Sequence, residues 1–315
     1  MLITGVAGFT GTHFAPLCAE RGAEVLGIGR GPRPDLPGLA DYEQLDLNDA
    51  SGLRAAVARM RPDWVVHLAA EASVVRALRA PTDVIKGNLT TSLNLLEAVR
   101  THAPDATVLI ACSAGAYGRP EYLPVDEQHP LVPLNPYGTS KALVDQLAAS
   151  YERSYGMRVI RARTFNFAGP GQTDAYVIGK LACRVAEAEA THPPDGRAEI
   201  TAGNLAVRRD FCDVRDGARA YWLALEGGLT GVFNVCSGRG TLLSDILADL
   251  AAHASLEVVA RTDPSLLRDD EVMEIVGSHD KLTEATGWRP EIEQSKMLLD
   301  TLDWWREHLA VGAAG

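Results

Sequence analysis

The chain has 315 residues, of which 46% are hydrophobic and 23% are charged, as in an ordinary globular protein. Its formal net charge of −11 argues against a nucleic-acid binder, which would carry a basic surface, and no apolar run reaches the roughly 20 residues of a membrane helix. The five cysteines lie far apart without a C-x-x-C pair, which indicates neither a metal site nor a disulfide framework. We therefore expect reduced thiols, a cytoplasmic location and no signal peptide.

Short apolar runs alternate with helical patterns over the first half of the chain, as in parallel β-α-β units. The almost unbroken apolar run near residue 110 is typical of a strand that is buried on both faces. These patterns predict an α/β fold of the Rossmann type, a doubly wound parallel sheet. Strands are predicted at 2–4, 24–28, 42–46, 64–68, 107–112 and 157–162, and helices at 12–21, 50–60, 83–102 and 136–156.

The pattern changes after Phe165, where glycines and prolines interrupt it and helices pair less regularly with strands. Helices are predicted at 213–226, 242–253 and 294–309, and a strand at 232–235. We expect a domain of residues 1–165, to which 209–235 return, and a smaller, mainly substrate-binding domain of residues 166–315.

The first strand and the first helix are joined by a glycine-rich turn. Gly5, Gly8 and Gly11 recur at intervals of three, with Phe9 and Thr10 between them. Glycine permits positive φ and lets the backbone approach a pyrophosphate closely. The helix that follows offers free amides and the positive end of its dipole to an anion. Because the strand and the helix supply the required context, this turn predicts a dinucleotide site in residues 1–165.

The end of the second strand indicates which dinucleotide is bound. An NAD site usually has an acidic residue here to accept from the ribose hydroxyls, but this strand ends in Ile28-Gly29-Arg30. Arg30, together with Arg33, could pair with a 2′-phosphate instead. We therefore favour NADP and leave NAD open. Asp46 either accepts from the adenine amino group or caps the helix that begins at Ala50.

Tyr137 and Lys141 are four residues apart in a predicted helix and so face the same side, one turn apart. Tyrosine ordinarily titrates at about pH 10, and a close ammonium should lower that pKa, which would make the phenol a proton carrier near neutral pH. Lys141 should also reach the nicotinamide ribose. Ser113 follows a strand at the edge where doubly wound sheets bind ligands, and it can donate to the same oxygen.

Two residues close to this group are expected to be structural. Cys112 should pack as a small apolar side chain rather than act as a nucleophile. His67, at the end of a predicted strand, should be a hydrogen-bonded core histidine rather than a proton shuttle.

These motifs together resemble the extended short-chain dehydrogenases/reductases, over nearly the whole chain. The segments that carry the resemblance in the first half are T-G-V-A-G-F-T-G at 4–11, His67-Leu68-Ala69-Ala70, Ser113 with Tyr117-Gly118, and Tyr137 with Lys141. The second half is similar to the branch of GDP-mannose 4,6-dehydratases and GDP-4-keto-6-deoxy-D-mannose reductases. Its segments are 163–166, 169–172, 203–205, 209–216, 234–238, 266–268 and 286–290.

The resemblance implies further site residues and an assembly. Asn88 would form the floor of the active site, Asn166 would contact a sugar nucleotide, and Arg209 and Arg268 would clamp its diphosphate through their guanidinium forks. The cofactor-binding residues would also include Leu47, Leu68, Ala69, Ala70 and Asn88. Relatives commonly form homodimers through the helices that correspond to 83–102 and 142–155, so a homodimer is expected.

One departure from the family pattern bears on the reaction. The 4,6-dehydratases carry acidic residues shortly after the catalytic Ser or Thr, where this chain has Ala114 and Gly115. Each missing proton carrier would cost about 10²–10⁴ in rate, which disfavours the dehydratase. Reductases usually keep those acids too, and often have His at Phe167. We therefore expect a reductase of a nucleotide-linked 4-keto-6-deoxy sugar first, a 4-epimerase with recycled cofactor second, and a dehydratase or a non-catalytic NADP-binding protein less readily.

Overall fold

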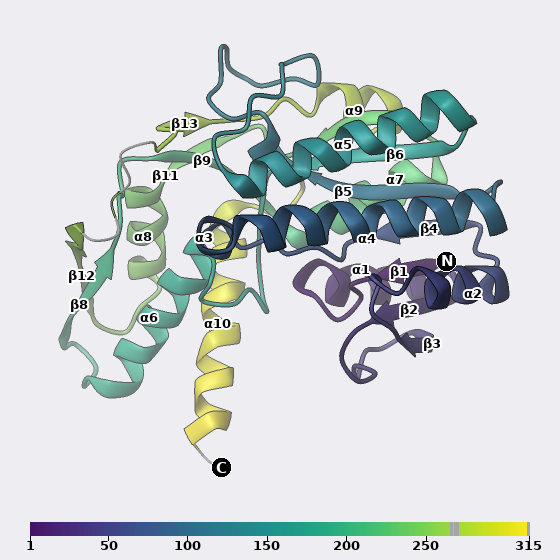
Figure 1. Ribbon diagram of the computed structural model, residues 1–315. Helices are drawn as coiled ribbons and strands as arrows, with labels where there is room; N and C mark the ends of the chain where they lie inside the picture. Colours follow the sequence, from purple (N-terminus) through teal and green to yellow (C-terminus); the bar gives the residue numbers. More distant parts are fainter. Residues whose placement is uncertain (265–266, 268–270, 314–315) are drawn as a thin grey trace.

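The structure, a computed structural model, describes residues 1–264, 267 and 271–313. Within these residues one parallel sheet has helices on both faces, and a second group of elements that includes α6, α8 and α10 lies beyond one end of its strands (Figure 1). The predicted Rossmann-type α/β fold is thus confirmed. No helix of the described part is long and apolar enough to cross a membrane.

The sheet contains seven strands in the described part of the chain, in the order β10-β6-β5-β4-β1-β2-β3. The chain leaves β1 toward β2 and β3 and then returns to build outward from β4, so the order reverses between β1 and β4. Doubly wound sheets bind ligands at such a reversal, beyond the carboxyl ends of the strands. The strands are β1 (Leu2–Thr4), β2 (Val25–Gly29), β3 (Leu39–Gln44), β4 (Trp64–His67), β5 (Thr107–Ser113), β6 (Arg158–Thr164) and β10 (Gly231–Val235).

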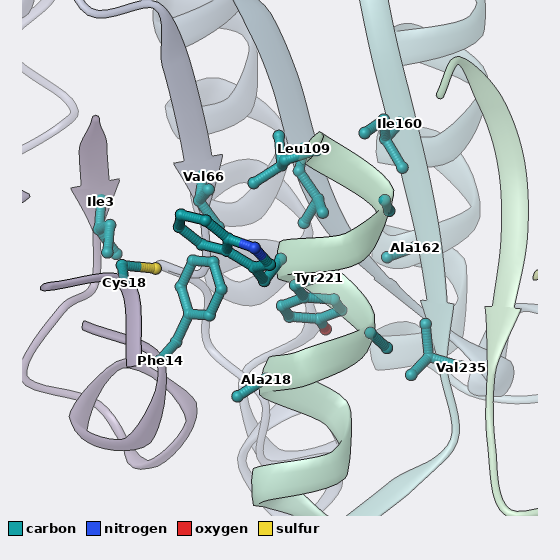
Figure 2. Close-up of a cluster of buried hydrophobic side chains, with 14 of the residues drawn as sticks. Ile3, Phe14, Cys18, Val66, Leu109, Ile160, Ala162, Ala218, Tyr221 and Val235 are labelled. Carbon is teal, nitrogen blue, oxygen red and sulfur yellow. The ribbon is translucent and has the colours of Figure 1, made fainter. Parts of the chain in front are cut away.

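Neighbouring side chains of each strand point to opposite faces of the sheet, so each face contributes to a separate apolar core. Ile3 and Val66 pack with α1 and α7 on one face, which Figure 2 shows with Phe14 and Tyr221 between the helices and the strands. Leu2 is buried on the other face under α2, α4 and α5. These helices are α1 (Phe9–Glu20), α2 (Ala50–Met60), α4 (Pro81–His102), α5 (Pro136–Tyr155) and α7 (Val214–Glu226), with the short α3 (Val74–Arg79) and the 3₁₀ turn η1 (Ala114–Ala116) nearby.

The rest of the chain forms two small sheets and a third apolar core between α6, α8 and α10. Of the segment 209–235 that was expected to return to the large sheet, α7 and β10 lie with it, whereas β9 pairs with β7, β11 and β13 instead. These elements are β7 (Asn166–Ala168), α6 (Val177–Thr191), β8 (Arg197–Ala202), β9 (Arg208–Asp213), β11 (Gly240–Leu242), α8 (Leu243–Ala252), β12 (Glu257–Thr262), β13 (Glu274–Ile275), α9 (Asp280–Thr286) and α10 (Gln294–Ala313).

The predicted bounds of β1 and α2 agree with the structure, while α1 begins three residues earlier than predicted. The helices α3, α6 and α9 and the short strands of the second half were not predicted. α6 packs an apolar face against α8, α10 and β8 and carries a polar stripe of Lys180, Arg184 and Glu187, so a helical pattern was present in its sequence and was missed. The short strands pair with segments distant in sequence, which no local pattern reveals.

Candidate active site

Two cavities meet at the carboxyl ends of β1 and β4, and Gly5, Gly8, Leu68 and Ala70 line both of them. The Tyr137 cavity, of about 440 Å³, is also lined by Ser113, Tyr137, Lys141 and Asn166. The Arg30 cavity, of about 560 Å³, is also lined by Arg30, Asp46, Leu47, Ala69 and Asn88. Most of the residues predicted to bind cofactor or substrate are thus brought together where the strand order reverses.

The glycine turn lies between the two cavities. Gly5 has φ +72°, and a Cβ on it would lie 2.7 Å from the backbone nitrogen of Ala69. Gly11 is helical, but a Cβ there would lie 2.4 Å from the carbonyl oxygen of Val6. Of the three glycines, then, Gly5 alone needs the left-handed conformation. Gly8 is the N-cap of α1 and supplies no side-chain cap, so the first amides of α1 can bind an anion, as a dinucleotide site requires.

Ser113, Tyr137 and Lys141 come from two neighbouring elements and line one cavity. Ser113 is the last residue of β5. α5 begins at Pro136, and the side chain of its N-cap, Asn135, accepts from the amide of Gly138 at 2.9 Å, which fixes the helix start beside the strand end. The Ser113 hydroxyl hydrogen-bonds to Tyr137, which favours the phenolate. The structure therefore brings the three residues of the predicted catalytic group together at one cavity.

The predicted lowering of the Tyr137 pKa by Lys141 is wrong for this structure. Burial raises the pKa of Tyr137 to about 12, against the opposing hydrogen bond from Ser113. The Lys141 ammonium donates to the carbonyl oxygen of Ala111 at 2.9 Å, and burial lowers its own pKa. Loss of hydration penalises the phenolate more than its polar neighbours stabilise it. Tyr137 therefore stays protonated at neutral pH, the state that a proton donor needs.

The described lining of the Tyr137 cavity contains no Asp, Glu or His. Ala114 is buried in η1 directly after β5. A Cβ on Gly115 would lie 3.3 Å from Ser113 Oγ and 3.5 Å from the ring of Tyr137. These two positions therefore adjoin the predicted catalytic group, and neither supplies a group that could carry a second proton.

Arg30 and Arg33 play different parts in the structure. Arg30 lines its cavity, and no hydrogen bond or ion pair of its side chain is found among the described residues. The Arg33 guanidinium donates to the carbonyl oxygen of Leu39 at 2.6 Å and so closes the loop between β2 and β3. Arg30 is the residue of the two that is available to an anion in the cavity.

The structure separates the two roles predicted for Asp46, because Asp46 lines the cavity and Asp49 caps α2. Asp46 accepts from the backbone and the side-chain amide of Asn48, both at 2.9 Å, and lines the Arg30 cavity. The N-cap of α2 is Asp49, whose carboxylate accepts from the amides of Ser51 and Gly52. The capping role suggested for Asp46 is therefore wrong.

Asn88 lies in α4 and links it to α5, the helix that carries Tyr137 and Lys141. Its buried side chain accepts from the amide of Glu71 at 2.8 Å and donates to the carbonyl oxygen of the same residue at 3.0 Å. It also donates to Ser140 Oγ at 2.9 Å, and that hydroxyl donates to the carbonyl oxygen of Tyr137. Asn88 thus fixes the loop after β4 relative to the start of α5.

The predicted substrate residues are only partly brought together. Asn166 lines the Tyr137 cavity, and its amide donates to the carbonyl oxygen of Asp210 at 2.8 Å. Arg209 donates to the carbonyl oxygen of Arg208 and is not among the described residues that line either cavity. Arg268 lies outside the described residues. The sequence reading missed the start of α6, from which Tyr176, Val177 and Ile178 line the Tyr137 cavity.

His67 is the hydrogen-bonded core histidine that was expected. Its Nε2 lies 3.0 Å from Ser92 Oγ, which donates its proton to the carbonyl oxygen of Asn88 at 2.8 Å. Nε2 therefore carries the histidine proton, and Nδ1 accepts from the Thr4 hydroxyl at 2.7 Å. Burial, together with the Lys141 charge, lowers the pKa of His67 to about 3. The ring is neutral and holds β1 and β4 together beneath the glycine turn.

Replacing His67 by Gln should flatten the pH dependence of stability in acid. In the folded state His67 takes up its second proton only near pH 3, whereas in the unfolded state it does so near pH 6.5. The unfolded state therefore binds more protons in acid, and this histidine lowers the free energy of unfolding as the pH falls. Relative to neutral pH, the loss in the wild-type protein at pH 5 should be about 2 kcal/mol. Urea unfolding of both proteins at several pH values measures it, and equal slopes would contradict the proposed burial. His308→Gln, at an exposed position of α10, is the control.

The chain is similar to a family of sugar-nucleotide enzymes. The family described as GDP-mannose 4,6 dehydratase matches residues 2–301. The GDP-6-deoxy-D-mannose reductase of Pseudomonas aeruginosa is 33% identical over 98% of both chains. The structure of RMD from Pseudomonas aeruginosa complexed with NADPH has a TM-score of 0.83 at 32% identity, covering 98% of this chain and 99% of the other. The Thermus thermophilus UDP-glucose 4-epimerase in complex with NAD has a TM-score of 0.83 at 33% identity, covering 97% and 98%.

Proposed function

The chain belongs to the GDP-mannose 4,6-dehydratase family of extended short-chain dehydrogenases/reductases, and from that premise we propose that it is an NADP-dependent reductase of a GDP-linked 4-keto-6-deoxy sugar. One observation carries the proposal. Ser113, Tyr137 and Lys141 line a cavity whose described lining has no carboxylate and no histidine. Such a site can deliver one proton to a carbonyl oxygen, but it lacks the additional acid and base that the removal of water requires.

The residues of the site have distinct roles in this reduction. When bound, NADPH supplies the hydride that adds to carbon 4 of the sugar. The carbonyl oxygen gains negative charge as its double bond to carbon 4 breaks, and Tyr137 transfers its phenolic proton to that oxygen. Ser113 donates a hydrogen bond to the same oxygen and stabilises the charge that develops there, and Lys141 would bind the nicotinamide ribose. A phenol with its pKa raised to about 12 is fully protonated at neutral pH and ready for this transfer.

The cofactor part of the proposal rests on the chain's own residues. The uncapped first turn of α1 suits the pyrophosphate, and the site has no acidic residue at the end of β2. Arg30 would bind the 2′-phosphate that distinguishes NADP from NAD. A relative with NADPH and a relative with NAD are both known, so NAD remains the alternative cofactor.

Replacing Arg30 by Ala should raise the KM for NADPH and leave the KM for NADH almost unchanged. A charge-assisted hydrogen bond contributes about 1.5–3 kcal/mol, so we expect a rise of roughly 10- to 100-fold. Initial rates with each cofactor measure the two KM values. Arg54→Ala, at an exposed position of α2, should change neither value. An equal rise in the KM for NADPH and for NADH in the Arg30 variant would show that Arg30 does not bind the 2′-phosphate.

We propose that the nucleotide diphosphate lies against the start of α6, beside Asn166. We propose Arg209 and Arg268 as further ligands of this diphosphate.

We also propose a cytoplasmic homodimer formed through α4 and α5, whose surfaces expose Leu93 and Leu143. Light scattering that gives the monomer mass of 33.7 kDa, or fractionation that finds the protein outside the cytoplasm, would contradict these assignments.

The function is tested with GDP-4-keto-6-deoxy-mannose and NADPH. We expect one NADPH consumed for each sugar reduced, measured by absorbance at the nicotinamide band and by NMR of the product. With GDP-mannose and NADP, no 4-keto sugar should form. Formation of a keto sugar from GDP-mannose would refute the proposal in favour of a dehydratase, and binding of NADPH without turnover of any sugar nucleotide would favour a non-catalytic protein.

A 4-epimerase is the second candidate, since the Thermus thermophilus UDP-glucose 4-epimerase is as similar in fold as the reductase. An epimerase uses the same three residues, but Tyr137 must first accept a proton from the sugar hydroxyl. The raised pKa of Tyr137 favours donation over that first step. Cofactor that copurifies and is not consumed while a UDP- or GDP-sugar changes configuration at carbon 4 would establish the epimerase instead.

A further inference from the structure

His13 connects the glycine turn to the loop on the other side of the Tyr137 cavity. It lies one turn after Phe9 in α1, and the two rings meet edge to face with centroids 5.6 Å apart. Its Nε2 lies 2.8 Å from the carbonyl oxygen of Pro170, in the loop after β7. A carbonyl oxygen can only accept, so Nε2 carries the proton and donates. The helix whose first turn lines the cavity is thereby bonded to a loop 157 residues away.

Gln172 continues this connection from the loop to α6. Its side chain is buried, and its Nε2 donates to the carbonyl oxygen of Phe167 at 2.6 Å. Its Oε1 accepts from the amide of Gly179, in the first turn of α6, at 3.0 Å. A Cβ on Gly179 would lie only 2.3 Å from the carbonyl oxygen of Thr173, so the loop and the helix start are in close contact. The position of the α6 start therefore depends on Gln172.

Resting on the proposed function, we propose that His13 is a positioning residue, which sets the place of Gln172 and of the start of α6 relative to the glycine turn. Both ends of this series of contacts line the Tyr137 cavity. Binding of the dinucleotide at the turn would then order the side of the cavity that receives the sugar nucleotide. The neighbouring Thr12, whose hydroxyl donates to the carbonyl oxygen of Phe9 in the same helix, has no such reach among the described residues.

Amide hydrogen exchange tests this role without any sugar substrate. His13→Phe keeps a ring but loses the donor, His13→Gln retains a side-chain N–H donor, and Thr12→Val is the matched control. One hydrogen bond of this kind changes a local equilibrium by about fivefold. Without added ligand, the amides of residues 174–182 should therefore exchange about fivefold faster in His13→Phe than in the other three proteins. Added NADPH should slow amide exchange at both 5–11 and 174–182 in wild type, His13→Gln and Thr12→Val. In His13→Phe it should slow exchange at 5–11 only.

Activity gives a second measurement. The KM for the sugar nucleotide should rise about fivefold in His13→Phe, with the KM for NADPH within twofold of the wild-type value, and His13→Gln should restore it. Equal exchange at 174–182 in wild type and His13→Phe overturns the inference, whether or not NADPH is present. Failure of the wild-type protein to bind NADPH contradicts the proposed function instead, and the exchange rates without ligand still decide the role of His13.

Discussion

Replacing Tyr137 by Phe should reduce kcat by about 10²–10⁴, since the site loses its proton donor. The substitution removes one oxygen from a partly buried ring and keeps its packing, so binding of both substrates should change little. The described lining of the cavity offers no carboxylate or histidine to take over the transfer, so residual turnover by another acid is not expected. Stopped-flow single-turnover rates with NADPH and the 4-keto sugar measure the chemical step directly.

The control for this variant is Tyr155→Phe. Tyr155 lies at the other end of the same helix with an exposed ring that contacts Tyr151 and Arg100. That variant should keep the wild-type rate. Full turnover by Tyr137→Phe would exclude the proposed proton donor, for the reductase and for the epimerase alike, and an equal loss in both variants would point to a general effect on α5.

Replacing Asp145 by Asn should lower the free energy of unfolding by about 3–5 kcal/mol, because it leaves buried guanidinium charges without their partner. Asp145 lies one turn after Lys141 in α5 and is fully buried. Its carboxylate accepts from Arg163 at 2.8 and 3.0 Å and from Arg161 at 3.0 Å. An amide would keep the shape of the carboxylate but not its charge. The contact holds α5, which carries Tyr137 and Lys141, to β6, next to the strand that ends in Ser113.

Urea unfolding of the wild-type and variant proteins measures this loss. The control is Glu293→Gln, which breaks an ion pair to Arg239 in which both side chains are about three-quarters exposed, at 75% and 74%. An exposed pair contributes little, so the control should stay within about 0.5 kcal/mol of wild type. A loss below about 1 kcal/mol in Asp145→Asn would mean that the arginines find other partners or water.

The sequence was informative wherever the chemistry is local in the chain. The alternation of apolar runs with helices predicted the Rossmann-type sheet, because a strand buried on both faces and the helix that covers it each have a pattern of their own. The glycine turn, the pair Tyr137 and Lys141 at helical spacing, and Ser113 at a strand end could all be read from short segments. The sequence also showed that positions 114 and 115 hold alanine and glycine instead of acidic residues, which is the main reason that a dehydratase is disfavoured.

Only the tertiary structure decided what depends on burial and on distant partners. The pKa of Tyr137 was expected to fall because Lys141 is one turn away, but the loss of hydration in the assembled cavity raises it. The connection from His13 through Pro170 to α6 joins segments 157 residues apart in the chain, and no local pattern marks either end. Sequence spacing fixes which residues share a face of one helix, whereas solvation and contacts between elements arise only once the whole chain has packed.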